Sequence, residues 1–297
     1  MGEFHVTIDL TTRCPHSCPH CNLRQASYGA RDLDPDALER ILSELDDRYD
    51  LGFIILTGGE PCLHPRFEEV VDICRRYDAG VGVNVATEVH PALADVDHVY
   101  VAVEPHREYG LRGALRTWDR VARLDPDEIY ANTVACRDTF GELDRVNEEV
   151  IGRGATAHFI IAYVPRGPDD PLDGYPHGEL PGLVAGLRRA LLAGMPFQEE
   201  VPFTSCRHGE YNVHVRVDGR LTPCQHWKGF TLNDLDEFER LRDLEPRGPC
   251  RGCPRFEECQ GGCNAYAWNV TGDLMPDPRC PRASERRRAS VQRSEEG

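Results

Sequence analysis

The stretch FHVTIDLTTRCPHSCPHC, residues 4–21, joins a strand pattern to three closely spaced cysteines. Apolar and polar side chains alternate over Phe4–Leu10, as they do in a half-buried strand. Cys14, Cys18 and Cys21 follow in the next loop. This loop therefore lies at the carboxyl end of a strand, which is where α/β folds bind their ligands.

The number of cysteines in the loop indicates what they hold. A structural zinc site closes on four ligands. A 4Fe–4S cluster held by three cysteines instead leaves one iron open to a small molecule. The loop favours such a cluster, and half of a zinc site completed elsewhere is the alternative.

Short apolar runs and amphipathic stretches alternate up to about residue 200, which is typical of repeated βα units and a parallel sheet. Strands are expected at residues 4–10, 52–56, 81–86, 99–103, 129–135 and 157–163. Helices are expected from Pro35, with Asp34 as the N-cap, and at residues 65–77, 111–121 and 143–150. Six such units are too few for a closed eight-stranded barrel, so we predict an α/β fold with an open, partial (β/α)6 barrel.

A second region is expected to begin near residue 200. A loop rich in Pro, Gly and Asp at 165–181 and a helix over Leu183–Leu192 precede it. Residues 211–217 then alternate up to Asp218-Gly219, which predicts a β-hairpin. We therefore expect a barrel over 1–200, a small cysteine-rich region over 201–281 and a disordered tail over 282–297.

Charge and composition exclude several classes of function. The 297 residues carry 50 acidic and 34 basic side chains, a net charge of −16. This charge disfavours nucleic acid and anionic membranes as partners and favours a polycation. Lys228 is the only lysine, so Schiff-base chemistry is also disfavoured. Because no leader or membrane-length apolar run is found, we expect a cytoplasmic protein whose 13 cysteines are reduced.

A second motif, LTGGEP at Leu56–Pro61, follows the second expected strand. Together with the CxxxCxxC spacing of the first loop, it resembles the radical S-adenosylmethionine (SAM) superfamily over residues 4–163. The resemblance implies that Cys14, Cys18 and Cys21 hold a 4Fe–4S cluster to which SAM binds. It also implies that SAM is contacted by these residues: Gly58, Gly59, Glu60, Pro61, Asn84, Thr87, Glu104 and Asn132.

The resemblance assigns these residues different roles. The glycines let the backbone approach SAM, and the Glu60 side chain meets the methionine ammonium group. The positions of Asn84, Thr87, Glu104 and Asn132 are those that contact the methionine carboxylate and the ribose. Each of these four residues is equally a common polar side chain at a strand end.

The chemistry implied by the resemblance is radical chemistry. An electron from the cluster cleaves SAM into methionine and a 5′-deoxyadenosyl radical, which removes hydrogen from an unactivated C–H bond. The protein holds that carbon close to the radical and excludes water. The electron would come from a reductant such as a flavodoxin or a ferredoxin.

The C-terminal cysteines resemble the SPASM or the shorter twitch extension of radical SAM enzymes, which binds auxiliary clusters. They are Cys206, Cys224, Cys250, Cys253, Cys259, Cys263 and Cys280. Two fully ligated clusters need eight thiolates. In one alternative, two auxiliary clusters form and one of them has an open position. Family pairing then suggests Cys206, Cys224 and Cys263 as ligands of one cluster and the other four cysteines as ligands of the second. In the other alternative, a single auxiliary cluster forms and some thiols are free.

Three further cysteines lie outside both groups. Cys74 shares the apolar face of its expected helix, which predicts burial. Cys136 and Cys62 follow strand ends, and Cys62 is a secondary candidate for a hydrogen donor. The histidines show no metal-ligand spacing, and His16 and His20 are expected to shape the cluster loop.

The substrate is the least determined feature. Charge and length resemble the aminoglycoside-modifying members, which implies a radical epimerase of antibiotic biosynthesis with a polycationic sugar substrate and Cys250 as the hydrogen donor. Peptide modifiers often carry a leader-binding domain before the barrel, whereas the first expected strand here begins at Phe4. The alternatives are a peptide-modifying SPASM enzyme, an aminocyclitol dehydrogenase, an electron-transfer or scaffold protein, and a zinc-stabilised binding module.

Overall fold

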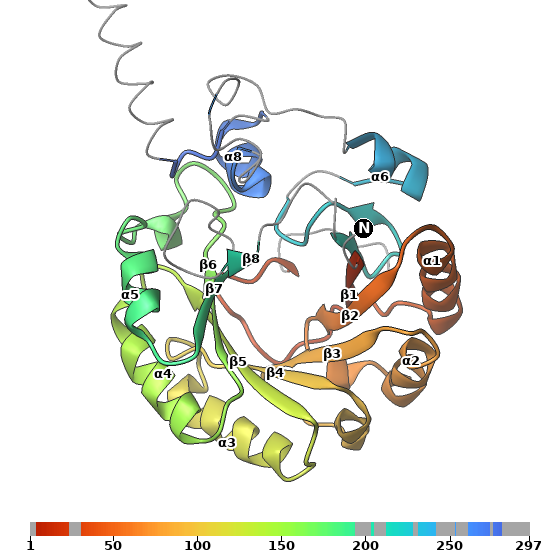
Figure 1. The fold of residues 1–297 in the computed structure, drawn as a ribbon, viewed down its shortest axis with the longest axis horizontal. Coiled ribbons are helices and arrows are strands. Elements are labelled where there is room, and N and C mark those ends of the chain that lie inside the picture. Colours follow the sequence, from red (N-terminus) through yellow and green to blue (C-terminus); the bar gives the residue numbers. More distant parts are fainter. Residues whose placement is uncertain are drawn as a thin grey trace, which may run out of the picture.

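The computed structural model describes residues 4–23, 31–193, 203–204, 212–227, 231–241, 253, 261–273 and 276–280. Its strands form one sheet in the order β10-β9-β1-β2-β3-β4-β5-β6-β7-β8. All neighbouring strands are parallel except β9 and β10, which form an antiparallel hairpin. The sheet curves into an open barrel with helices on its outer side (Figure 1). The predicted α/β partial barrel is therefore confirmed.

The first six strands lie close to the predicted positions. They are β1 (Phe4–Thr11), β2 (Leu51–Gly58), β3 (Gly80–Val85), β4 (His98–Ala102), β5 (Glu128–Ala135) and β6 (His158–Ala162). The helices that cover them are α1 (Pro35–Arg48), α2 (Phe67–Cys74), α3 (Gly110–Ala122), α4 (Leu143–Gly152) and α5 (Leu180–Gly186). Their apolar faces pack on the sheet, because 3.6-residue periodicity on the helices meets alternation on the strands.

Helix α1 shows how the local sequence sets an element. The Asp34 side chain accepts a hydrogen bond from the Asp36 backbone N–H, and Pro35 occupies the first turn, as predicted. Leu38, Leu42 and Leu45 are fully buried against the sheet. Burial of this stripe supplies most of the helix's stability in the fold.

One predicted helix is wrong. Over Leu183–Leu192 the chain forms the end of α5 and then strand β7 (Ala190–Ala193), which pairs with β6. Arg189 has a φ of 49°, which breaks the helical path, and Leu192 is buried beside β6. A short apolar run is compatible with a helix or with a buried strand. Here residues 190–193 form a strand because they pair with β6.

The sheet extends beyond the six predicted units at both edges. Strand β8 (Phe203–Thr204) adds to β7, and the predicted hairpin forms from β9 (Asn212–Val215) and β10 (Leu221–Thr222), with Gly219 at a φ of 77° in its turn. Strand β9 also pairs in parallel with β1. The domain boundary at residue 200 stays a prediction, and the predicted tail over 282–297 lies outside the described residues.

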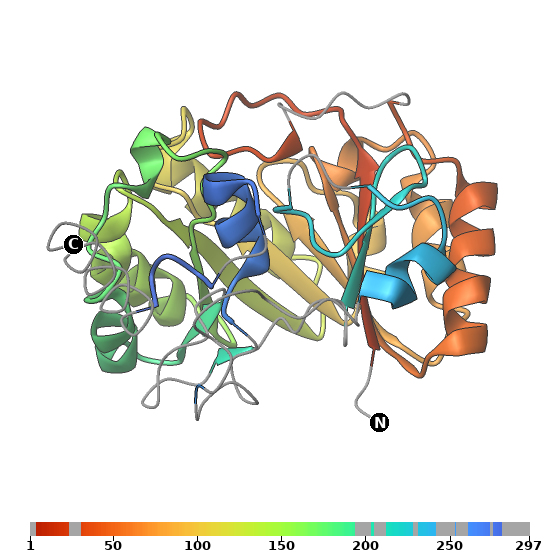
Figure 2. The ribbon, with the colours of Figure 1, turned by 90° about the horizontal axis from the view of Figure 1, so that it is seen from above.

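Two helices of the C-terminal region lie across the side that α1–α5 leave uncovered: α6 (Leu235–Leu241) and α8 (Asn264–Thr271) (Figures 1 and 2). Side chains of α8 form a small apolar cluster with Val164, which follows β6, and Trp227, which follows β10. Within the described parts of the chain, no helix is long and apolar enough to span a membrane.

Candidate functional site

A cavity of about 220 Å³ lies at the carboxyl ends of the barrel strands. The three cysteines of the first loop, Cys14, Cys18 and Cys21, line it. Strand ends across the sheet contribute Gly58, Gly59, Asn84, Glu104 and Asn132, and Asp9 lines it from β1. Eight residues that we predicted to hold the cluster or contact SAM, several of them far apart in the sequence, thus meet with others at one place, as expected for an α/β fold.

Backbone hydrogen bonds join the cysteine loop to the neighbouring strand end. Gly59 N–H donates to the Thr11 carbonyl oxygen at 2.7 Å, and Glu60 N–H donates to the Arg13 carbonyl oxygen at 2.8 Å. The Arg13 guanidinium also donates to both oxygens of Asp32, with distances of 2.7–3.1 Å. The start of the cysteine loop, just before Cys14, is therefore held by the LTGGEP motif and by Asp32.

The two glycines of the LTGGEP motif are required by close backbone approach. A Cβ atom on Gly59 would lie 2.3 Å from the Arg13 carbonyl oxygen. Gly58 has a φ of 124°, where a side chain is strained, and its Cβ would lie 2.8 Å from the Thr11 carbonyl oxygen. Glycine at both positions lets the LTGGEP motif pack against the start of the cysteine loop, and both glycines line the cavity.

The Glu60 side chain makes hydrogen bonds that the sequence did not predict. Its carboxylate is fully buried and accepts hydrogen bonds from the backbone N–H groups of Ala86, Thr87 and Glu88 at the end of β3. Burial raises its pKa to about 7, although these hydrogen bonds oppose the shift. Glu60 is not among the residues that line the cavity and holds the turn after β3, and its predicted contact with the methionine ammonium group stays a prediction.

Two other residues predicted to contact SAM, Pro61 and Thr87, are also not among those that line the cavity. Pro61 is buried at the start of a short 3-10 helix, and the Thr87 hydroxyl lies 2.7 Å from Nε2 of His16. His16 belongs to the cysteine loop, so Thr87 supports that loop, as was expected of His16 itself. Asn84 and Asn132, in contrast, line the cavity and are joined by a 2.7 Å hydrogen bond.

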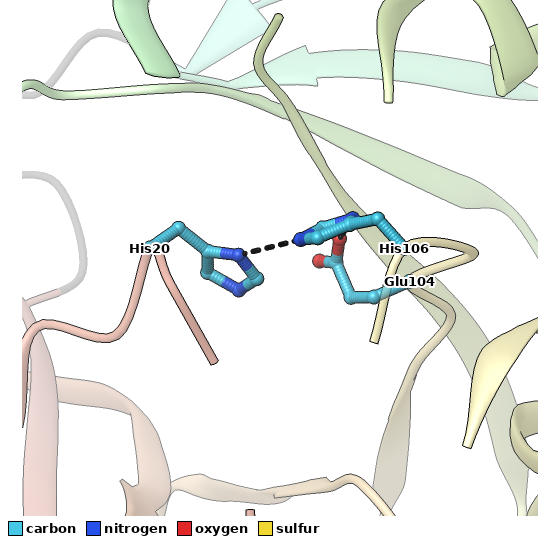
Figure 3. A group of neighbouring side chains, drawn as sticks. All are labelled: His20, Glu104 and His106. Atoms are coloured by element: carbon cyan, nitrogen blue, oxygen red, sulfur yellow. Dashed lines mark hydrogen bonds and ion pairs between the residues drawn. The ribbon is translucent and has the colours of Figure 1, made fainter. Parts of the chain in front are cut away.

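Glu104 lies in the wall of the cavity with a cluster of neighbours that the sequence did not reveal. It is fully buried, and its Oε1 accepts a hydrogen bond from the Val134 N–H. Burial raises its pKa to about 7. Figure 3 shows His106 beside it and His20, from the cysteine loop, beyond His106. Arg107 completes the group. Polar residues directly after the strand at 99–103 were the available signal.

Three of the C-terminal cysteines that the structure describes, Cys224, Cys263 and Cys280, lie near α8. Cys224 and Cys263 pack against the same apolar cluster of Val164, Trp227, Ala265 and Tyr266. The buried Asp277 joins Cys263 to Cys280. Its carboxylate accepts a hydrogen bond from the Cys263 N–H, and its backbone carbonyl oxygen accepts one from the Cys280 N–H. Cys253 is half-buried. Cys206, Cys250 and Cys259 lie outside the described residues.

The remaining cysteines do not reach the cavity. Cys74 is fully buried in α2, as predicted. Cys136 is buried near the end of β5, and burial raises the pKa of the Cys62 thiol to about 12. Neither Cys62 nor Cys136 is among the residues that line the cavity, and the role of Cys62 as a secondary hydrogen donor stays a prediction.

Comparison with known proteins identifies the relatives of this chain. The Radical SAM superfamily matches residues 8–123. Mycofactocin maturase MftC of Mycolicibacterium smegmatis is 26% identical, covering 93% of this chain and 82% of its own length. PqqA peptide cyclase of Methylocella silvestris is 25% identical, covering 94% and 88%. The crystal structure of Streptococcus suis SuiB bound to its precursor peptide SuiA superposes with a TM-score of 0.71 at 12% identity, covering 94% of this chain and 76% of SuiB.

These findings confirm the superfamily and correct the finer resemblance. The cofactors predicted from the sequence, a 4Fe–4S cluster and SAM, are those of the matched superfamily. The residues that line the cavity fit these cofactors, because three cysteines are available for the cluster and the backbone of the two glycines is available for SAM. The predicted resemblance to the aminoglycoside epimerase neomycin C epimerase is not supported, because the relatives named above are maturases and a peptide cyclase.

Proposed function

Since this chain is a radical SAM protein over residues 8–123, we propose that it is an enzyme that modifies a peptide. One observation carries the proposal: the similarity to PqqA peptide cyclase extends over 94% of the chain and 88% of the cyclase, well beyond the SAM-binding half. The mycofactocin maturase has a similar extent, and SuiB, solved with a precursor peptide, has the same fold.

The residues of the cavity have distinct parts in this proposal. Cys14, Cys18 and Cys21 would hold the cluster, and Gly58 and Gly59 would present backbone groups to SAM. When bound, the cluster and SAM supply the radical that removes a hydrogen atom from carbon. Asn84 and Asn132 would bind polar groups of SAM, with their amides oriented by the hydrogen bond between them.

The wall opposite these strands suits a peptide. Gln225 and His226, which follow the predicted auxiliary ligand Cys224, line the cavity beside Asn22 and Leu23 of the cysteine loop. Amide and imidazole groups can donate to and accept from a peptide backbone. Asn22 Nδ2 lies 2.6 Å from Nδ1 of His226, so this contact joins the C-terminal region to the cluster loop.

The C-terminal cysteines would bind an auxiliary cluster. Cys224, Cys263 and Cys280 are brought together around α8 and Asp277, and Cys206, Cys253 and Cys259 complete the proposed set. A small flavodoxin or ferredoxin is the proposed external reductant. Iron quantitation after anaerobic reconstitution distinguishes one auxiliary cluster from two, since each cluster adds about four irons to the four of the first site.

The test of the proposal uses the reconstituted, reduced full chain with SAM. We expect 5′-deoxyadenosine to form faster in the presence of the peptide encoded by a short reading frame beside the gene, and the peptide to change mass. Neomycin serves as the competing substrate. Absence of 5′-deoxyadenosine under all conditions would contradict the radical chemistry, and turnover of neomycin but not of peptide would contradict the substrate class.

Running the same reaction in deuterium oxide tests the predicted role of Cys250. If the enzyme is an epimerase in which a thiol returns the hydrogen, the product acquires solvent deuterium at the inverted carbon. The Cys250→Ala variant should then cleave SAM but lose inversion. A crosslinked or oxidised product without deuterium on carbon would contradict the predicted role of Cys250 as hydrogen donor.

A further inference from the structure

Four polar side chains connect the cysteine loop to the wall of the cavity at Glu104. His20 lies between Cys18 and Cys21, and Glu104, His106 and Arg107 follow β4. Nδ1 of His20 lies 3.1 Å from Nε2 of His106, and a terminal nitrogen of Arg107 lies 3.1 Å from Nε2 of His20. Nδ1 of His106 faces Oε2 of Glu104 at 3.7 Å (Figure 3).

The chemistry of arginine fixes the direction of every contact in this group. A guanidinium only donates hydrogen bonds, so Nε2 of His20 must accept. The proton of a neutral His20 is then on Nδ1 and is donated to Nε2 of His106. The proton of His106 is in turn on Nδ1, directed at the carboxylate of Glu104. Two hydrogen bonds therefore run from Arg107 through His20 to His106, and the Nδ1–H of His106 faces the Glu104 carboxylate at 3.7 Å, just beyond hydrogen-bond distance.

The same contacts argue against a metal ion among His20, Glu104 and His106, which lie close enough to hold one. Metal binding needs a free lone pair on each imidazole. Nε2 of His20 already accepts from Arg107, and Nε2 of His106 accepts from His20. The guanidinium of Arg107 also lies 4.0 Å from Glu104 and would repel a cation at that place.

We propose that His106 is a positioning residue with two separate tasks, holding the cluster loop through His20 and orienting the Glu104 carboxylate toward SAM. The proposal rests on the proposed function, because it takes Glu104 as a contact of SAM. Oε2 of Glu104 and Nδ1 of His106 are both buried and have no closer hydrogen-bond partner in the described parts of the chain. His106 thus faces that oxygen with Nδ1 while its Nε2 accepts from His20.

Two substitutions separate the tasks, because amide side chains overlay different halves of an imidazole. The nitrogen of Asn occupies the place of Nδ1, so His106→Asn keeps the donor toward Glu104 and loses the acceptor for His20. The oxygen of Gln occupies the place of Nε2, so His106→Gln keeps the acceptor for His20 and loses the donor to Glu104. His98→Asn and His98→Gln, on β4 but outside the cavity, are the matched controls.

The measurements use the reconstituted full chain without a peptide substrate. For His106→Asn we expect iron from the first cluster to be lost to a chelator about 10-fold faster, with the SAM dissociation constant nearly unchanged. For His106→Gln we expect the SAM dissociation constant, followed by the SAM-induced change in the electron paramagnetic resonance spectrum of the reduced cluster, to rise about 10-fold with normal iron retention. The auxiliary cysteines can be replaced by Ala to isolate the first cluster.

The outcomes are decisive in either direction. Equal losses of iron and of SAM affinity in both variants, or none in either, would overturn the assignment of two tasks. A cobalt absorption band in protein lacking the three loop cysteines, removed by His106→Asn, would show a metal site instead. Failure of the proposed function is distinguishable. If SAM does not bind the first cluster, wild-type protein shows no SAM-induced spectral change, and if only the peptide substrate is wrong, both readouts are unaffected because no peptide is present.

Discussion

The two cysteine-bearing regions of this chain are held in different ways. The loop of Cys14, Cys18 and Cys21 is joined to its neighbours by backbone hydrogen bonds at adjacent strand ends, so the register of β1 and β2 sets its shape. Cys263 and Cys280 are instead joined through the buried Asp277: the Cys263 N–H donates to its carboxylate, which also pairs with the buried Arg279 guanidinium, and the Cys280 N–H donates to its backbone carbonyl oxygen. The first site depends on the sheet, and the second depends on a few buried side chains.

The largest effect expected on the first region comes from its ligands. Cys14→Ala should abolish SAM cleavage, because two thiolates do not hold the open cluster, and 5′-deoxyadenosine should fall to the level of iron-free protein. Chromatography with mass detection measures it. Cys74→Ala, a fully buried thiol in α2, is the control and should retain cleavage. Cleavage by Cys14→Ala at the wild-type rate would remove this loop from the chemistry.

The second region should be the more sensitive to loss of a single charge. Arg279→Met leaves the Asp277 carboxylate buried without its cation, which costs about 3–5 kcal/mol. Hydrogen exchange should show α8 losing protection while β3 keeps it. Arg145→Met breaks an exposed pair with Glu142 and should cost at most about 1 kcal/mol. Equal loss of protection in α8 and β3 would contradict the separate support of the two regions.

Acid should weaken the barrel through His158 on β6. Its Nε2 lies 2.9 Å from the Thr133 hydroxyl, and burial lowers its pKa to about 4. The unfolded chain binds a proton at higher pH than the folded chain, so this histidine makes stability fall as pH drops from about 6.5 to 4. The fall is at most about 3 kcal/mol. Denaturant unfolding of His158→Gln should show a flatter dependence over this range, and an unchanged slope would count against the cause.

The smallest expected effect concerns the contact between the LTGGEP motif and the cysteine loop. Gly59→Ala places a Cβ against the Arg13 carbonyl oxygen and should cost about 1–3 kcal/mol, with weaker SAM binding. Gly152→Ala, which has open space at the end of α4, should stabilise the fold by about 0.5–1 kcal/mol. Thermal unfolding and a SAM titration measure both. If the two substitutions have the same effect, the close approach is not what requires glycine at position 59.

Local signals in the sequence were enough for much of the fold. Alternation predicted β1, and Asp34 with Pro35 predicted the start of α1, because these features depend on neighbouring residues. The pairing of β9 with β1 and of β7 with β6 was not predicted, since a pairing partner leaves no mark in a strand's own pattern. For the same reason the apolar run at 183–192 was assigned to a helix.

The site was predictable where a residue acts from a strand end and not where it acts through a distant partner. Asn84 lies on β3, Glu104 just after β4 and Asn132 on β5, and the cavity brings them together. The position of Glu60 in the motif gave no sign that its carboxylate accepts from three backbone N–H groups after β3. His106 and Arg107 were missed, because their importance arises from contact with His20 across the cavity wall.

The place of β1 between β2 and β9 has a consequence for synthesis on the ribosome. One edge of β1 can pair as soon as β2 emerges, whereas the other edge remains open until residues 212–215 have been made. An open strand edge is a template for pairing with other chains. The segment that leads into the first cysteine loop is therefore among the earliest parts made and among the last to be enclosed, so the open edge of β1 in a nascent chain stalled before β9 is a place where aggregation can begin.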